Sequence, residues 1–207
     1  MARGPNIDSE KMKEAIVEQA GYIIGEEGLQ GLSIRKISGR IGCSVGTIYN
    51  IFRNLDEVIL SINGLTLDDL YFQLESVIAG IVEPKTGVQR LAQKYIEFSR
   101  DNLHLWNTLF DHRLPEGTPL PGWLQYKIDK PFLLVGKTLA PLLTDNEERE
   151  RTARILWAGL HGICSLSLSG KLKTVKAETA SVLAASFIDT YLAGVCDCPS
   201  ASFKTHS

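Results

Sequence analysis

The sequence has few features of a membrane protein or of a disulfide-stabilised, secreted protein. Its longest uncharged stretch, residues 155–170, has 16 residues, whereas a bilayer-spanning helix needs roughly 20 predominantly apolar ones. The four cysteines lack the spacing of a disulfide framework, which favours a reducing, cytoplasmic compartment. Residues 1–14 contain no apolar run, so we expect no secretory signal.

Sequence signals of catalysis are also missing. There is no glycine-rich loop that could hold a phosphate, no Gly-x-Ser-x-Gly elbow and no paired-carboxylate motif. His161 and Cys164 have a spacing that permits two metal ligands on one helix, but nothing in the sequence supplies a third. We therefore predict no catalytic residue, no metal site and no cofactor, and hence a protein that is not an enzyme.

The charge is nearly balanced overall but uneven along the chain. Lysine and arginine number 22, aspartate and glutamate 24, which gives a net charge of −2. Residues 33–53 nevertheless contain four basic side chains and no acidic one. A local basic patch on an acidic body is sufficient for contact with a polyanion, because the field near the site matters more than the total charge.

This basic segment has the pattern of a helix-turn-helix. Ile34, Ile37 and Ile41 recur at helical spacing and predict a helix over residues 34–41. Gly42 suits the left-handed backbone that ends a helix, and Ser44 can cap a second helix over residues 45–51. Two short helices joined in this way can present the second one to the major groove of DNA.

The rest of the chain also reads as helices, because strand signals are absent. Asp8 or Ser9 is expected to cap a first helix, and Asn54 a fourth one that keeps helical spacing up to Pro84. Thr144 or Asp145 is expected to cap the helix over residues 145–169. Residues 114–121 form a loop rich in proline. The predicted segments, by residue number, are 9–27, 34–41, 45–51, 55–82, a fifth helix after 84, 103–111, 122–144 with breaks at Pro131 and Pro141, 145–169 and 175–195.

The run SIRKISGRIGCSVGTIYNIFRNLDEVI closely resembles the signature of the TetR family of bacterial transcription regulators. The capping serine, the Gly-x-Ser turn and the Tyr-x-x-Phe spacing all fall in register over residues 9–62. One position departs from the pattern, since Leu55 stands where the family usually has a phosphate-contacting lysine. Farther along, Trp157 to Gly162 resembles a subgroup with a Trp-Ala-x-x-His-Gly element.

The resemblance implies an all-helical homodimer that binds DNA and responds to a small effector. For this chain it implies a DNA-binding domain (1–54), a connecting helix (55–84), an effector-binding and dimerisation domain (85–196) and a flexible tail (197–207). Dimer contacts are expected from about 146–169 and 175–195. The expected function is that of a ligand-responsive repressor that binds a near-palindromic operator. The alternative is a helical dimeric adaptor without a DNA-binding role.

Candidate site residues follow from the helix-turn-helix pattern, from the resemblance and from composition. Tyr49 is expected at a phosphate, and Val45 either contacts a thymine methyl or packs in the core. The candidate DNA-binding residues are Ser33, Arg35, Lys36, Ser44, Val45, Gly46, Thr47, Tyr49, Asn50 and Arg53. Aromatic residues with few polar anchors are typical of a ligand pocket, although they are equally typical of an ordinary core. The candidate ligand-binding residues are Trp106, Phe110, Trp123, Tyr126, Phe132, Trp157 and His161.

Overall fold

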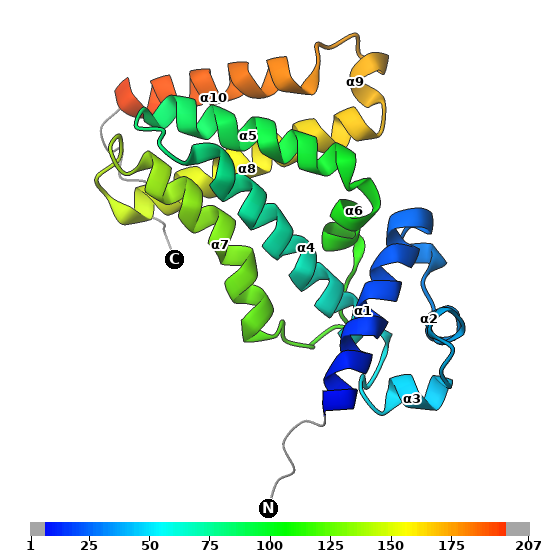
Figure 1. Cartoon of the computed structure of the whole chain (residues 1–207). Helices are drawn as coiled ribbons and strands as arrows, with labels where there is room; N and C mark the ends of the chain where they lie inside the picture. Colours follow the sequence, from blue (N-terminus) through cyan, green and yellow to red (C-terminus); the bar gives the residue numbers. More distant parts are fainter. Residues whose placement is uncertain (1–6, 198–207) are drawn as a thin grey trace, which may run out of the picture. The chain divides into compact units, whose positions relative to one another are not determined.

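The computed structural model describes residues 7–197, and in that range the chain forms α-helices and one short 3₁₀ helix, with no strand (Figure 1). The predicted all-α fold is confirmed. In chain order the elements are α1 (Ile7–Glu27), η1 (Leu29–Gly31), α2 (Ile34–Ile41), α3 (Val45–Tyr49), α4 (Leu55–Ile78), α5 (Pro84–Asp101), α6 (Leu103–Asp111), α7 (Gly122–Leu139), α8 (Asn146–Leu168), α9 (Lys171–Thr174) and α10 (Ala180–Asp197). None of these helices is long and apolar enough to cross a bilayer.

The chain divides into two compact units. The first consists of Met1–Leu70 and Asp101–Ile128, and the second of Tyr71–Arg100 and Asp129–Ser207. Consequently α4 and α7 each contribute residues to both units, whereas α6 belongs to the first. The functional division at residues 54 and 84 stays a prediction. Of the predicted tail 197–207, residues from 198 onward lie outside the described range.

The core of the first unit holds the short helices α2 and α3 against α1 and the start of α4. Isoleucine dominates this core, which suits close packing between helices. Its buried members are Ile16, Val17, Ala20, Ile23, Ile24, Leu32, Ile34, Ile37, Ile48, Phe52, Val58, Ile59 and Ile62. Since α2 and α3 are too short to be stable helices alone, this shared core is what fixes their positions.

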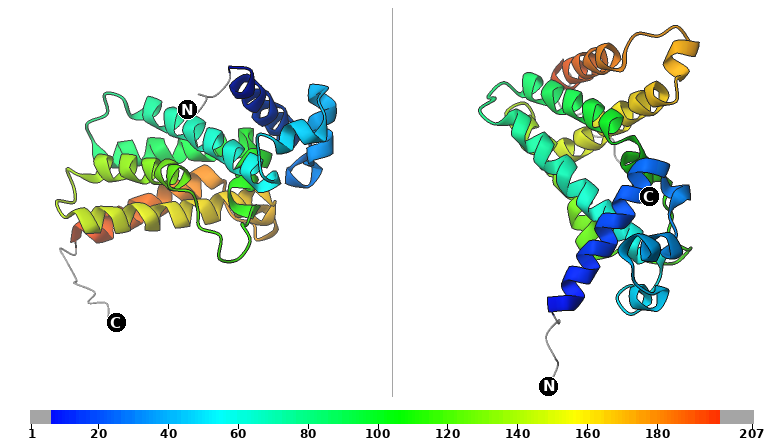
Figure 2. Two further views of the ribbon diagram at one scale, coloured as in Figure 1. Left: turned by 90° about the horizontal axis from the view of Figure 1, so that it is seen from below. Right: turned by 45° about the vertical axis from the view of Figure 1, so that its right-hand side comes forward.

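In the second unit α8 and α10 lie side by side (Figure 2). Leu156 and Leu160 are buried on α8, and Ile188 and Leu192 on α10. A polar contact joins α5 to α10, where the Gln89 amide donates to the Asp189 carboxylate at 2.6 Å. The second unit is therefore held mainly by apolar contact between helices.

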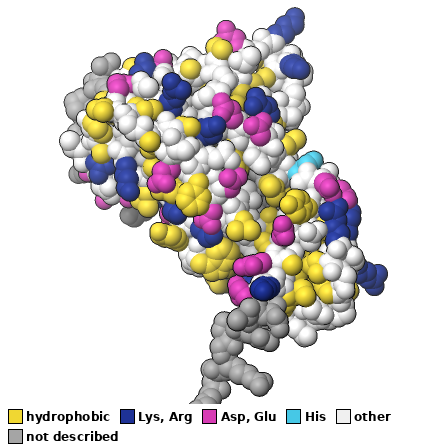
Figure 3. All heavy atoms as spheres, in the orientation of Figure 1, with side chains coloured by type: hydrophobic (Ala, Val, Ile, Leu, Met, Phe, Trp, Pro, Cys, Tyr) yellow, Lys and Arg dark blue, Asp and Glu magenta, His cyan; other side chains and the backbone are white. Residues whose placement is uncertain are grey.

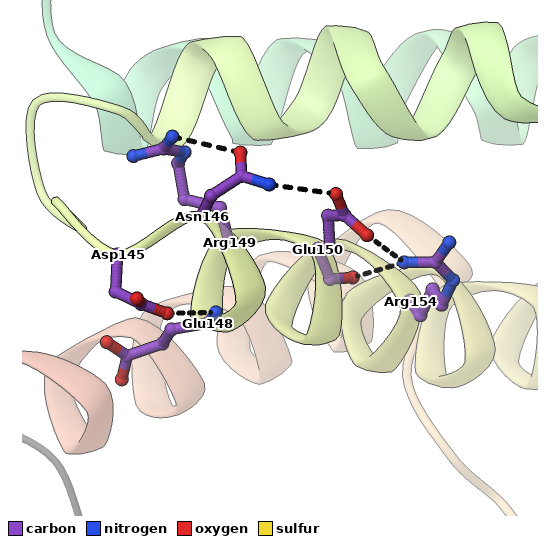
Figure 4. A network of polar contacts seen from close by, with 6 residues as sticks. All are labelled: Asp145, Asn146, Glu148, Arg149, Glu150 and Arg154. Carbon is purple, nitrogen blue, oxygen red and sulfur yellow. Dashed lines mark hydrogen bonds and ion pairs between the residues drawn. The ribbon is translucent and has the colours of Figure 1, made fainter.

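A polar network fixes the start of α8 (Figure 4). The Asp145 carboxylate accepts from the backbone N–H of Glu148 at 2.7 Å and caps the helix, as one of the two predicted capping residues. The Arg149 guanidinium donates to the Leu143 carbonyl at 2.8 Å and so ties the preceding loop to the helix. The position of this helix end is thus set by local chemistry that the sequence displays.

Several predicted helix ends are wrong. α1 begins at Ile7, so neither Asp8 nor Ser9 is its N-cap. α3 ends at Tyr49 instead of residue 51. α4 ends at Ile78, so residues 55–84 are not one continuous helix. Gly80 adopts φ +78° just beyond this end, a conformation that stops an α-helix and that glycine adopts without strain.

Two further corrections concern the second half of the chain. α7 continues through Pro131, where a break was predicted, and ends at Leu139. A proline in a helix removes one backbone hydrogen bond, and here the helix tolerates that loss. The last helix begins at Ala180 instead of residue 175, because Lys176 has φ +54° and Thr179 accepts from the backbone N–H of Val182.

Candidate functional site

Three local features set the helix ends in the helix-turn-helix. The Ser33 hydroxyl accepts from the backbone N–H of Lys36 at 3.3 Å and caps α2. Gly42 follows α2 with φ +77°, where a side chain would be strained. The Ser44 hydroxyl accepts from the backbone N–H of Thr47 at 3.0 Å and caps α3. Both predicted caps are confirmed, and the turn between the two helices has the predicted chemistry.

Helix α3 has one buried side chain and a solvent-facing surface. Ile48 is fully buried in the core of the first unit, and Val45 packs against that core while remaining partly exposed. Tyr49 is 53% exposed, and Gly46 and Asn50 are exposed. The candidate residues of α3 therefore reach solvent, and Leu55, the departure from the family pattern, packs against the core.

Three of the four basic side chains of the segment have acidic partners. Lys36 pairs with Glu27 and Arg40 with Glu26, so both bridges join α2 to the end of α1. Arg53 is almost fully exposed and pairs with Glu57 at 3.6 Å. Figure 3 shows basic and acidic side chains adjacent to each other over this part of the molecule.

Arg35 differs from these three, because within the described range no acidic side chain pairs with it, and it is exposed. Residues 33–53 contain no acidic side chain. In the folded protein, however, acidic side chains of α1 and α4 lie beside their basic ones. The prediction of a purely basic patch missed this neutralisation, because the partner carboxylates of α2 come from a helix that ends before the segment begins.

The candidate ligand-binding residues Trp106, Phe110, Trp123 and Tyr126 belong to the first unit. Trp106 is buried, and its ring meets that of Phe110 edge to face at 5.1 Å. The Trp123 ring lies over the backbone of Gly64 on α4, and the Lys127 ammonium lies 5.9 Å from the centre of that ring. Tyr126 is 64% exposed. Tyr126 is therefore the most exposed of the four candidates and the least suited to line an enclosed pocket.

The other three candidates, Phe132, Trp157 and His161, form a ladder of rings in the second unit. The Phe132 and Trp157 rings meet edge to face at 5.6 Å, and Trp157 and His161 at 5.3 Å. The His161 Nδ1 and the Tyr95 hydroxyl share a hydrogen bond at 3.2 Å. Burial lowers the pKa of His161 below its ordinary value, which favours the neutral imidazole.

The seven candidates are thus distributed over both units, four in the first and three in the second. Tyr95 in the second unit contacts His161 but is not among the seven candidates predicted from the sequence. Its helical spacing carried no sign of the polar partner on α8. Among residues 7–197, no group of three histidine, cysteine or acidic side chains could hold a metal ion.

An open hollow of about 530 Å³ lies on the surface of α8 in the second unit. All of its lining residues come from that one helix: Glu147, Glu150, Arg151, Arg154, Ile155 and Ala158. A hollow lined by a single helix is a surface feature and not an enclosed ligand pocket. Four of its six lining residues are charged, and only Ile155 and Ala158 are apolar.

Comparison with known proteins gives one family match. A family model described as the tetracyclin repressor-like, C-terminal domain matches residues 88–191. That match covers half of the chain and lies entirely outside the helix-turn-helix. No curated protein matches the chain.

Several solved structures share the fold. A protein of unknown function from Rhodococcus sp. RHA1 is 18% identical, with a TM-score of 0.71 over 89% of this chain and 95% of that one. The TetR family regulator PfmR from Thermus thermophilus is 18% identical, with a TM-score of 0.58 over 87% and 98%. RolR in complex with resorcinol is 14% identical, with a TM-score of 0.65 over 88% of both chains. At such identities the likeness concerns the fold.

Proposed function

We propose, given that the chain belongs to the TetR family of transcriptional regulators, that it is a repressor that binds a near-palindromic operator as a homodimer. A small effector releases it from the DNA. The observation that carries the proposal is the capped helix-turn-helix, whose second helix is anchored by Ile48 and exposes Tyr49. Such a regulator acts in the cytoplasm, where bacterial DNA lies.

In the proposed DNA complex α3 enters the major groove. Gly46 allows close approach of the backbone, Val45 and Thr47 face base edges or phosphates, and Tyr49 donates to a phosphate. Ser33 and Ser44 stand at helix N-termini, where exposed backbone N–H groups favour anions. Asn50 stands at the other end of α3, where its side-chain amide can donate to a phosphate. Two copies of α3 in a dimer would lie about 34–36 Å apart, one turn of DNA.

The proposed dimer forms through α8 and α10, over about 146–169 and 175–195. Ile155 and Leu166 on α8 and Val182 on α10 are exposed apolar side chains, and Ile155 also lines the hollow on α8. A second copy that covered these side chains would bury apolar surface, which favours association.

The proposed effector is a small, largely aromatic molecule. The two groups of rings described above supply the apolar and aromatic surface typical of ligand sites, and RolR, a protein of similar fold, binds resorcinol. Effector and operator would be negatively coupled through α4, since this helix contributes to both units. By reciprocity, operator DNA weakens effector binding by the same factor.

The test compares variants on a duplex that the protein itself selects from a random pool. Arg35→Ala should reduce the slope of log affinity against log salt by about one per subunit, because one phosphate contact is lost. Tyr49→Ala should weaken binding to all sequences alike and leave the slope nearly unchanged. Arg90→Ala, which removes an exposed arginine of α5, is the control and should bind like the wild type.

Two results would contradict the proposal. Wild-type affinity of both Arg35→Ala and Tyr49→Ala at every salt concentration would remove α2 and α3 from the DNA interface. A selection that enriches no duplex would favour the helical adaptor instead. Titration by fluorescence anisotropy at several salt concentrations distinguishes these outcomes.

A further inference from the structure

Asn63 on α4 has a buried carbonyl oxygen without a hydrogen-bond donor. The residue is 6% exposed, and among the side chains that the structure describes its Oδ1 is the one buried polar atom lacking a partner. Buried polar groups in folded proteins are nearly always paired, because an unpaired one loses its hydration without compensation. Thr66, equally buried on the same helix, follows this rule, since its hydroxyl donates to the Ile62 carbonyl at 3.0 Å.

Asn63 lies on a largely apolar side of α4. Positions three and four residues apart lie on the same side of a helix, so Asn63 shares its side of α4 with Leu60, Thr66 and Leu67. These two leucines form a buried cluster with Leu124 of α7. Partly buried apolar residues that pack against this cluster are Leu109, Leu114 and Ile128. Asn63 thus stands on a side of α4 whose other side chains are mostly aliphatic, and the hydroxyl of Thr66 on that side is already paired.

A half-exposed aromatic ring covers the backbone next to Asn63. Gly64 follows Asn63, and a Cβ at this position would lie 2.7 Å from the Trp123 ring, so only glycine admits the ring so close. Trp123 is 47% exposed and stands in the first turn of α7, directly after the proline-rich loop. Asp68, the nearest carboxylate along this helix, is already paired with Lys127.

We infer that the Asn63 carbonyl is the polar anchor of a ligand site on α4, and that it accepts a hydrogen bond from a neutral, largely apolar small molecule with one hydroxyl or N–H group. The inference rests on the proposed effector-responsive function and specifies its ligand. The ligand is neutral, since a cation would lose its hydration among leucines with no free carboxylate in the cluster. Its donor satisfies Asn63, its apolar body packs against the leucines, and Trp123 is the ring that moves to admit it.

The experiment uses matched probes that differ only in the donor. Phenol is compared with anisole, and 1-naphthol with 1-methoxynaphthalene, by isothermal titration of the full chain. The wild type should prefer the hydroxyl compound of at least one pair by about fivefold to tenfold, the value of one hydrogen bond to a buried acceptor. Asn63→Leu, similar in shape without the acceptor, should lose this preference. Thr66→Val removes an already paired buried hydroxyl and should keep it.

Three results would overturn the inference: no binding of any of the four probes, equal affinities within both pairs for the wild type, or an unchanged preference in Asn63→Leu. The leucine variant should fold at least as stably as the wild type, because it removes an unpaired buried group. Asn63→Ala serves as a second variant with the same expected loss of preference. Operator binding is measured separately on the same proteins. Absence of operator binding in the wild type would contradict the proposed function. Equal affinities of the wild type for hydroxyl and methoxy probes would contradict only the inference.

Discussion

The Cys164 thiol lies on the buried side of α8 and is held in its protonated form. Burial raises its pKa to about 11, and a hydrogen bond with Ser99 offsets only part of that rise. Since the thiolate is the nucleophile, a group so rarely ionised near neutral pH is protected twice, by its charge state and by its position. Cys43, in the turn of the helix-turn-helix, is partly exposed and has no such protection from burial.

Cys164 should therefore resist alkylation by iodoacetamide at pH 8 in the folded protein, while Cys43 reacts. Addition of denaturant should make Cys164 reactive, because unfolding exposes it. Mass spectrometry of digested samples gives the modified fraction at each site. Equal rates for the two cysteines in the folded protein would mean that α8 opens at this point.

The raised pKa of Cys164 also predicts how the stability of the fold changes with pH. Above pH 9 the unfolded chain loses the thiol proton more readily than the folded one, so stability decreases as the pH rises from about 9 towards 11. Cys164→Ala should remove this part of the alkaline loss. Denaturant unfolding of both proteins at pH 8, 9 and 10 tests it, and parallel curves for the two proteins would contradict it.

Residue roles that depend on neighbours in the chain could be predicted from the sequence, whereas roles that depend on the fold could not. Ser33, Ser44 and Asp145 cap helices as predicted, because a cap reaches only two or three residues along the chain. The unpaired carbonyl of Asn63 and the bridge from Lys36 to Glu27 depend on which helices meet. A single sequence contains no pattern that specifies which helices pack against each other.

At the scale of elements, the helices themselves were predictable and some of their ends were not. α2 has the predicted bounds, since Ser33 caps its start and Gly42 marks its end. α6 also has the predicted bounds, although no capping side chain marks its start. The end of α4 was misplaced, because Ile81 continues the apolar spacing although Gly80 has already turned the chain. Periodicity reports which side chains share a face, but it does not report where the backbone leaves the helix.

The close contact of α8 with α10 depends on a residue without a side chain. A Cβ at Gly159 would overlap the Phe187 ring of α10, whereas a Cβ at Gly136 of α7 would meet no other group. Gly159→Ala should lower the free energy of unfolding by about 1 kcal/mol, since displacement of the ring outweighs the helix-forming advantage of alanine. Gly136→Ala should raise it by up to about 1 kcal/mol.

Urea unfolding followed by circular dichroism compares these two glycine variants with the wild type. The prediction is that Gly159→Ala destabilises the protein and Gly136→Ala stabilises it. Stabilisation by both substitutions would mean that α8 and α10 can accommodate a methyl group at position 159.

At the scale of the whole molecule, the proposed homodimer makes a quantitative prediction. Sedimentation at micromolar concentration should give about twice the chain mass of 22.8 kDa. Leu166→Glu places a charge on an exposed apolar position of α8 within the proposed interface, and it should shift the protein towards the monomer because a buried unpaired charge is costly.

Leu133→Glu is the matched control for the dimer. Leu133 is an exposed apolar residue of α7 in the same unit, outside the proposed interface, and its replacement should leave the mass unchanged. A monomeric wild type at micromolar concentration would contradict the homodimer.

The two ion pairs between α1 and α2 have a consequence for how the protein would search a genome. Glu26 pairs with Arg40 and Glu27 with Lys36. In the proposed complex these carboxylates would hold the positions that DNA phosphates take. If α2 contacts DNA as proposed, every duplex would have to displace these carboxylates. Their displacement would weaken binding to DNA of any sequence and shorten the time spent at each non-specific site. Glu27→Gln should then raise the affinity for random DNA and for the selected duplex by about the same factor, as competition titrations would register. The carboxylates of α1 would thus set the overall strength of DNA binding, and the contacts of α3 would set the preference for one sequence.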